Sequence, residues 1–231
     1  MNKYLRFILP AIAIIFLFNA GAGIVSAQGV LQKILKRMDD HNKALTSLKG
    51  SIKMNKVNTQ LGENDLYVGE ISYLPGRSEK QIYVRIDWKS PAVEHLSVAD
   101  GEYRFYNPRL KQMIVGKVEK AQSGAGAGNA LAFMSMSKAQ LSENYTVQYL
   151  GDESVASGDK TFHLELIPKK ATSYKSAHLW VDANGMPLQA RIVEKNSDTT
   201  TILLYNLQKN TNVKASVFSI VPPKGTKIVQ G

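Results

Sequence analysis

The sequence predicts a mainly β domain to which helices are added. Apolar and polar residues alternate strictly over 81–88, and Asn184-Gly185 is typical of a hairpin turn between two apolar segments. Alternation with a period of two sends successive side chains to opposite faces of a sheet, so one face of the sheet is apolar. Asn-Gly pairs favour tight hairpins because both residues tolerate a positive φ. A segment with helical spacing of apolar residues, 30–48, precedes these strands.

Strand-like segments follow one another along the whole chain after that helix. In the first half they are 51–57, 65–74, 81–88, 93–99, 102–106 and 112–118. In the second half they are 145–150, 160–168, 176–182, 188–195, 199–207 and a last edge near 217–221. Short connections between them predict antiparallel pairing. About eleven such strands in one domain must curl into a barrel, an incomplete barrel or a sandwich.

The N-terminal residues are typical of an export signal. Lys3 and Arg6 precede an apolar segment at 7–18, and Val25-Ser26-Ala27 offers the small residues that signal peptidase prefers. We therefore predict a cleaved signal peptide over 1–27, a single domain over 28–231 and a periplasmic location. An uncleaved membrane anchor is the alternative, although the apolar segment is short against the roughly 20 residues of a spanning helix.

The composition restricts the classes of partner and of stabilisation. The chain has no cysteine, so neither disulfides nor a lipid on an N-terminal cysteine are available to it. Its formal net charge is +10. Such a charge suits anionic membranes or acidic partners, but the basic residues are scattered, which equally describes a solvated surface. Nothing in the pattern indicates nucleic-acid binding.

A glycine- and alanine-rich segment, 123–128, precedes a short apolar segment at 130–136. The glycine spacing matches neither a dinucleotide-binding fingerprint nor a phosphate-binding loop. A hinge followed by a lid helix is one interpretation, and an ordinary packed helix is the other. The apolar residues of this segment are Leu131, Phe133, Met134 and Met136.

No enzymatic constellation is recognisable. The four histidines are dispersed without metal-binding spacing, and no nucleophile motif occurs. We predict no catalytic activity, no metal and no cofactor. A curved sheet with an amphipathic helix and an apolar lid instead suits the binding of an apolar ligand.

Two motifs resemble those of the periplasmic outer-membrane lipoprotein carriers of the LolA type. The first runs from Ser97-Val98-Ala99-Asp100-Gly101 through Phe105-Tyr106-Asn107-Pro108 to Gln112. The second, over 218–225, is similar to the closing F-x-x-x-P-P-x-G signature of that family. The order of signal peptide, amphipathic helix, strands, mobile apolar helix and strands is similar as well.

The resemblance implies an incomplete antiparallel β-barrel covered by an N-terminal helix and a short lid helix. It also implies a monomeric carrier that takes lipoproteins from an inner-membrane ABC-type exporter. The carrier shields their acyl chains and delivers them to an outer-membrane receptor. In that family an arginine before a proline turn holds the lid closed. Here Leu74 precedes Pro75, so we name Arg85 as the candidate for contact with the 130–141 segment, with Arg77 as an alternative.

Alternation and apolar character select the residues expected to face acyl chains. They are Ile82, Val84, Ile86, Phe105, Leu131, Phe133, Met134, Met136 and Trp180. A soluble periplasmic lipid-binding protein, or an envelope-stress sensor of the same fold, is the alternative function. The sequence does not decide whether the cargo is lipoprotein or free lipid.

Overall fold

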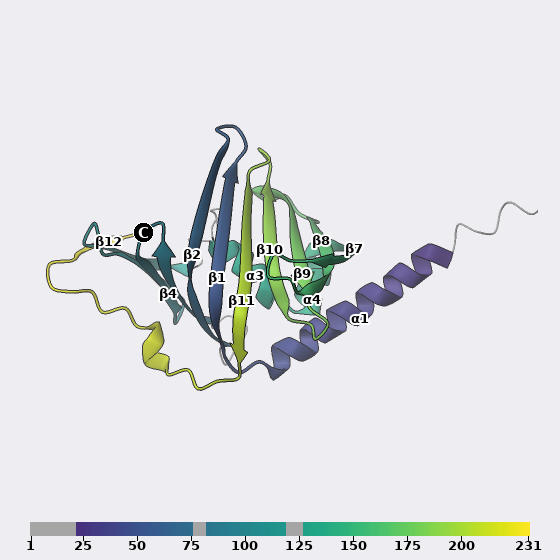
Figure 1. Cartoon of the computed structure of the whole chain (residues 1–231), viewed down its shortest axis with the longest axis horizontal. Coiled ribbons are helices and arrows are strands. Elements are labelled where there is room, and N and C mark those ends of the chain that lie inside the picture. Colours follow the sequence, from purple (N-terminus) through teal and green to yellow (C-terminus); the bar gives the residue numbers. More distant parts are fainter. Residues whose placement is uncertain (1–21, 76–81, 119–126) are drawn as a thin grey trace, which may run out of the picture.

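The computed structural model describes residues 22–75, 82–118 and 127–231. One curved sheet dominates it, and α1 (Ala22–Ala44) lies against the β7–β10 half of that sheet and projects beyond it (Figure 1). The short helices α3 (Ala127–Ser135) and α4 (Lys138–Asn144) lie on the same side of the sheet as α1. The last helical element, η1 (Ala215–Phe218), is a 3-10 turn near the C-terminus.

Twelve strands form the sheet in the order β12-β6-β5-β4-β3-β2-β1-β11-β10-β9-β8-β7. The strands are β1 (Leu48–Asn58), β2 (Glu63–Pro75), β3 (Ile82–Ser90), β4 (Glu94–Ala99), β5 (Glu102–Asn107), β6 (Gln112–Lys117), β7 (Tyr145–Ser154), β8 (Lys160–Pro168), β9 (Tyr174–Val181), β10 (Pro187–Glu194), β11 (Thr199–Lys209) and β12 (Lys227–Gln230). Its edges, β7 and β12, do not pair with each other, so the sheet stays open. The predicted incomplete barrel is confirmed.

The first helix and the last strand differ most from their predicted positions. The helix spans Ala22–Ala44 rather than 30–48, and Leu48 already begins β1 because that strand pairs on both sides, with β2 and β11. The edge strand expected near 217–221 is replaced by η1, and the true last strand, β12, pairs in parallel with β6. The helix α4 was not predicted from the sequence, although Ser137 and Gln140 form a capping box at its N-terminus.

The inner, concave face of the sheet is apolar because alternate residues of each strand point to it. Ile52, Ile71, Ile86, Leu164 and Ile202 are all nearly inaccessible to solvent. They form one continuous core with residues of α1, α3 and α4. Because each strand presents its apolar set to one side, a wide sheet needs helices on that side only.

The C-terminal segment covers part of the outer face. Phe218 packs its ring against Tyr83, and its carbonyl oxygen accepts a hydrogen bond from the Ser97 hydroxyl. Beyond it, Ile220 forms a small second core with Tyr106 and Met113. The chain then returns to add β12 to the sheet edge (Figure 1).

The turn between β9 and β10 is pressed against α1. Asp182 Oδ1 accepts hydrogen bonds from the backbone N–H groups of Asn184 and Met186, which confirms the predicted turn. Gly185 has φ +87°, and a Cβ there would lie 2.2 Å from the carbonyl oxygen of Arg37. Only glycine satisfies both the conformation and this close approach.

We expect Gly185→Ala to lower the free energy of unfolding by about 2 kcal/mol or more, since it adds a clash with the α1 backbone to the cost of the positive φ. Gly158→Ala is the matched control, because Gly158 has φ +90° but no atom within 4 Å of the position that a Cβ would take. We expect the control to cost about 1 kcal/mol. Equal losses in chemical denaturation would show that the α1 contact contributes nothing.

Candidate functional site

A cavity of about 570 Å³ lies between the inner face of the sheet and α3. The strands β1 to β5 and β11 form one wall of it, and the end of α1 closes another. Its lining is largely apolar. The strand residues that line it are Leu48, Ile71, Tyr73, Ile82, Val84, Leu96, Val98, Tyr103, Tyr145, Tyr174 and Leu204.

The cover of the cavity is α3 together with the residues that follow it. Leu131, Phe133, Met134 and Met136 all line the cavity. Phe133 and Met134 are buried, with 3% and 7% of their surfaces exposed, while Leu131 and Met136 are partly buried. Methionine side chains adapt to irregular apolar surfaces, which suits a cover over a variable ligand.

Six of the nine residues predicted to face acyl chains line this cavity. They are Ile82, Val84, Leu131, Phe133, Met134 and Met136. Ile86 shares their face of the sheet but is sealed in the core with no exposed surface. Phe105 lies on the cavity side of β5, two residues from Tyr103, without lining the cavity.

Trp180 lies on the other face of the sheet. Its neighbours Leu179 and Val181 point into the core, so Trp180 points outward. There it stacks on His163 at 4.2 Å between ring centroids and donates a hydrogen bond from Nε1 to Glu153. Its burial, with 2% exposed, comes from this cluster and from Arg191 over its ring. Period-two counting from the apolar neighbours would have excluded it.

Arg85 also lies on the outer face. Its guanidinium donates to Asp87 Oδ1 from both Nε and Nη2, at 2.8 and 2.7 Å, and His95 approaches the same carboxylate oxygen. The pKa of Asp87 is lowered by Arg85 and His95 despite an opposing effect of burial, which is the largest single influence. Within the described residues no hydrogen bond or ion pair joins Arg85 to the 130–141 segment, and Arg77 lies outside those residues.

The residues that sequence reasoning missed are the cavity-facing side chains of neighbouring strands. Ile71 and Tyr73 on β2, and Leu96 and Val98 on β4, alternate as regularly as Ile82 and Val84 do. The alternation signal was present in the sequence. What the sequence lacked was the order of strands that brings these residues around one cavity.

Two polar residues of α1, His41 and Asn42, also line the cavity. Asn42 Nδ2 donates to the carbonyl oxygen of Met136 at 3.4 Å. His41 Nε2 is buried without a hydrogen-bond partner among the described atoms. The pKa of His41 is lowered, chiefly because burial disfavours its charged form. Burial therefore makes the His41 imidazole harder to protonate than a free histidine.

An aromatic contact closes the end of the cavity near α4. The Tyr145 and Tyr174 hydroxyls are 2.7 Å apart, and Phe133 packs edge-on against both rings at 5.7 Å. Burial, and then the hydrogen bond with Tyr145, raise the pKa of Tyr174. The tyrosine pair thus holds the cover residue Phe133 in place.

The start of α4 is tied to α1. Asp39 Oδ1 accepts a hydrogen bond of 2.6 Å from the backbone N–H of Lys138, the first residue of α4. A carboxylate at this position also complements the positive end of the helix. The junction between α3 and α4 is therefore fixed by α1, while the other end of α3 follows residues outside the described part of the chain.

We expect Asp39→Ala to lower the free energy of unfolding by about 1–2 kcal/mol, because a charge-assisted bond to a helix terminus is lost. Hydrogen exchange of the 136–141 amides should also become faster. Asp40→Ala is the control, since Asp40 pairs with Lys36 on the exposed side of α1 and should cost little. Unchanged exchange in Asp39→Ala would show that this bond does not hold the junction.

The histidine cluster under Trp180 makes stability depend on pH. His163 Nε2 lies 3.0 Å from His178 Nδ1. Burial is the main cause that lowers the pKa of each histidine. In the unfolded chain these histidines take up protons near pH 6.5. In the folded protein they take up protons only at a lower pH. The unfolded state therefore binds more protons as the pH falls.

We expect the contribution of this cluster to be complete above about pH 6.5 and to disappear as the pH falls through the lowered pKa values. Melting temperatures measured between neutral and acidic pH should show this loss. A His163→Gln/His178→Gln variant should show a smaller dependence on pH over the same window, with His41 still contributing. An unaltered slope in the variant would contradict the assignment.

Within the described residues, no group of acidic or histidine side chains is arranged to hold a metal ion. No helix in the same ranges combines the length and the apolar character that crossing a membrane requires.

Known proteins resemble the chain in both sequence and fold. The family model of the outer membrane lipoprotein carrier protein LolA matches residues 81–221. No curated protein sequence matches significantly. A crystal structure of an uncharacterized conserved protein from Thermus thermophilus matches with a TM-score of 0.55 and 12% identity over 87% of this chain and 99% of that one.

MucB is similar in fold as well. Its crystal structure matches with a TM-score of 0.52 and 15% identity, over 86% of this chain and 64% of MucB. In the complex of MucA and MucB from Pseudomonas aeruginosa the values are 0.49 and 14%, over 82% and 60%. At such identities these likenesses concern the fold alone. The family model spans β3 to β11 together with the cover helix α3, and on that match the chain belongs to the LolA family of outer-membrane lipoprotein carrier proteins.

Proposed function

We propose that this protein is a periplasmic carrier that binds the acyl chains of lipoproteins in the cavity beneath α3. The observation that carries the proposal is a cavity of about 570 Å³ with a largely apolar lining, a volume typical of ligand sites. The family supports the same class of ligand. The predicted signal peptide over 1–27, with cleavage after Ala27, would bring the protein to that compartment.

The free energy of binding comes from removing acyl chains from water. Each buried methylene contributes roughly 0.8 kcal/mol, so a long chain would be held too firmly to be released. The empty protein offsets part of this gain because Phe133 and Met134 are already buried against the sheet. A ligand must displace them, so only the difference between the two burials holds the cargo.

The partners in this proposal are those of a carrier. An inner-membrane ABC-type exporter would load lipoproteins into the cavity, and an outer-membrane receptor would remove them. No catalytic step is needed, since transfer between apolar sites proceeds by exchange of buried surface. The protein would act as a monomer.

The test is release of lipoproteins from spheroplasts that have accumulated them. We expect the purified protein to bring triacylated lipoprotein into the soluble fraction in a one-to-one complex, identified by mass spectrometry, which also defines the N-terminus. Leu131→Glu should reduce recovery about tenfold or more, because it places a charge in the apolar cavity. Leu61→Glu, at a residue 68% exposed in the β1–β2 turn, is the matched control.

Each other outcome identifies a different function. Recovery of free lipid alone would favour a soluble lipid-binding protein. The carrier role would be contradicted if the purified protein recovered neither lipoprotein nor lipid in the presence of the exporter. Circular dichroism would first establish that the protein and both variants are folded. Capture of an envelope-stress regulator in place of lipoprotein would favour a sensor of the same fold.

A further inference from the structure

Two tyrosine hydroxyl groups meet at the end of the apolar cavity next to α4. Tyr145 follows the last residue of α4 and begins β7, and Tyr174 begins β9. Their hydroxyl oxygens lie 2.7 Å apart, a distance typical of a hydrogen bond between hydroxyls, and both residues line the cavity. Tyr145 is buried, with 8% of its surface exposed. The pair therefore places hydroxyl groups at one end of a largely apolar space.

The pair has one hydrogen-bond donor more than it can use internally. Each tyrosine hydroxyl carries one hydrogen and can also accept, so in a mutual bond one hydroxyl donates and the other accepts. The hydrogen of the accepting hydroxyl is then left over. Among the described residues neither hydroxyl has a hydrogen bond besides this one. One O–H donor is therefore available at this end of the cavity, and such a donor is stabilised when it finds an acceptor away from water.

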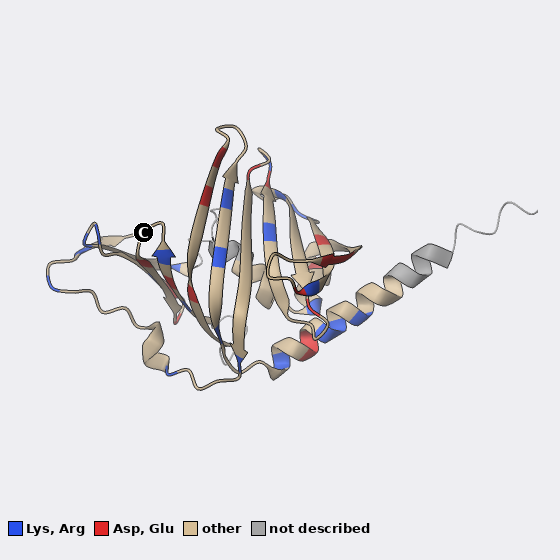
Figure 2. Cartoon of the chain, in the orientation of Figure 1, with Lys and Arg blue, Asp and Glu red and all other residues tan. Residues whose placement is uncertain are grey.

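The acceptor that suits this donor is uncharged. Among the described residues that line the cavity there is no lysine, arginine, aspartate or glutamate, although such residues are frequent along α1 and the strands (Figure 2). An ionised ligand group in this space would lose hydration without gaining an ion pair. A carbonyl oxygen accepts a hydrogen bond without carrying a charge. Ester and amide carbonyls join the acyl chains of a triacylated lipoprotein to the rest of the molecule.

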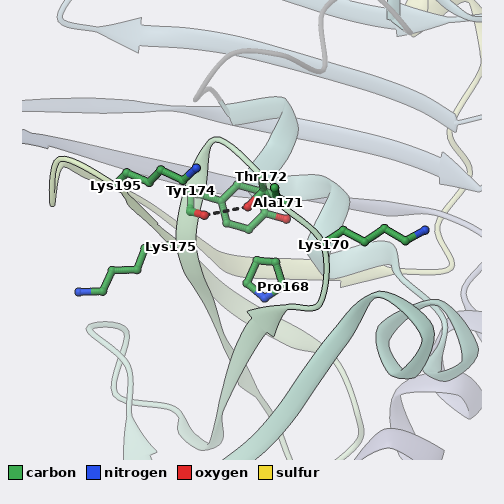
Figure 3. Close-up of a pocket in the computed structure, with 7 residues that line it drawn as sticks. All are labelled: Pro168, Lys170, Ala171, Thr172, Tyr174, Lys175 and Lys195. Atoms are coloured by element: carbon green, nitrogen blue, oxygen red, sulfur yellow. Dashed lines mark hydrogen bonds between the residues drawn. The ribbon is translucent and has the colours of Figure 1, made fainter.

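Tyr174 stands between the cavity and the protein surface. It also lines a second pocket of about 290 Å³, which is formed by the loop after β8, the start of β9 and Lys195 (Figure 3). The ammonium groups of Lys170 and Lys175 extend away from that pocket in opposite directions, so they leave it open at the surface (Figure 3). Thr172 Oγ1 holds the loop by donating to the carbonyl oxygen of Tyr174 at 2.7 Å. A ligand with its carbonyl at the tyrosine pair therefore has a route for its polar part to the surface.

The cover helix covers the tyrosine pair in the empty protein. Phe133 packs edge-on against the rings of Tyr145 and Tyr174, with 5.7 Å between ring centroids in each case. A ligand that displaces Phe133 gains access to the two rings and to their hydroxyls together.

We propose that the Tyr145–Tyr174 pair donates a hydrogen bond to the ester or amide carbonyl at the end of a bound acyl chain. This inference rests on the proposed acyl-binding function and deepens it by naming the group that fixes the end of the chain. The hydroxyl that donates within the pair polarises its partner, so the second hydroxyl becomes a stronger donor to the ligand. The pair thus orients the cargo, with its chain beneath α3 and its polar part toward the pocket at the β8–β9 loop.

The test compares two lipids that differ only in this carbonyl, 1-lauroyl lysophosphatidylcholine and its ether analogue, 1-dodecyl lysophosphatidylcholine. In the ether a methylene group replaces the carbonyl, while the chain length and the headgroup are the same. Both are titrated by calorimetry, below their critical micelle concentrations, into the purified protein and into Tyr145→Phe/Tyr174→Phe. We expect the ratio of the ester affinity to the ether affinity to fall about fivefold in the double variant, the size of one neutral hydrogen bond exchanged for bonds with water. Intrinsic differences between the two lipids cancel in this comparison.

Phenylalanine keeps the rings that pack against Phe133, so the double variant removes only the two hydroxyl groups. Tyr67→Phe/Tyr205→Phe is the matched control, because these tyrosines lie under the ammonium groups of Lys56 and Lys53 and line neither pocket. The control should leave the ratio unchanged. A second readout is the infrared stretch of an isotope-labelled ester carbonyl. Its frequency should be lower in the complex with the wild-type protein than in the complex with the double variant.

The outcomes separate this proposal from the proposed function. A ratio that stays the same in the double variant, whether both affinities fall or neither does, would overturn the carbonyl site and leave acyl binding standing. A ratio that falls equally in the control variant, or a carbonyl frequency that is the same in both complexes, would overturn it as well. Binding of neither lipid to the wild-type protein would instead reject the cavity as an acyl site, and with it the proposed function.

Discussion

The structure depends on covering the apolar concave face of a sheet that does not close. An open sheet of twelve strands leaves that face too wide for strands alone to seal. Exposed apolar surface of this extent would promote association with other molecules. α1 covers one half permanently, fixed by the close approach at Gly185 and by the Asp39 bond to α4. α3 packs on β10 and β11 and covers the cavity that β1 to β5 line, so this is the least completely packed part of the core.

The outer face of the sheet is covered in a different way. Polar and aromatic side chains form clusters on it, and the C-terminal segment of the chain packs against part of it. Around Trp180, His163 stacks on the ring and the Glu153 carboxylate accepts the hydrogen bond of the indole N–H. Around Ser97, the C-terminal segment lays Phe218 and then Ile220 on β3 to β6 before ending as β12. Since β12 pairs in parallel with β6, it also protects one edge of the sheet from pairing with another chain. The outer face is therefore covered in part by these clusters and by the C-terminal segment.

Local patterns predicted most of the strands, since period two is a property of a few adjacent residues. The β8 boundaries were predicted to the residue, and Asn184-Gly185 was correctly placed in a turn. Errors arose where distant partners decide the conformation. Leu48 reads as helical next to Leu45, yet pairing with β2 and β11 makes it a strand residue. Trp180 and Arg85 were assigned by apolar character or by analogy, while the face on which each lies follows from the neighbouring residues.

The aromatic contact at Tyr174 links the cover of the cavity to its surroundings. Phe133 of α3 packs on the Tyr145–Tyr174 pair, so moving α3 exposes both rings and leaves their shared hydrogen bond at the end of the cavity. Tyrosine suits this position because its ring packs against apolar atoms while its hydroxyl keeps a polar partner. A cover that rested on aliphatic residues alone would lose only apolar contact when displaced. Here the same displacement also uncovers the hydroxyl pair of Tyr145 and Tyr174, so opening the cover changes both the apolar and the polar surface at this end of the cavity.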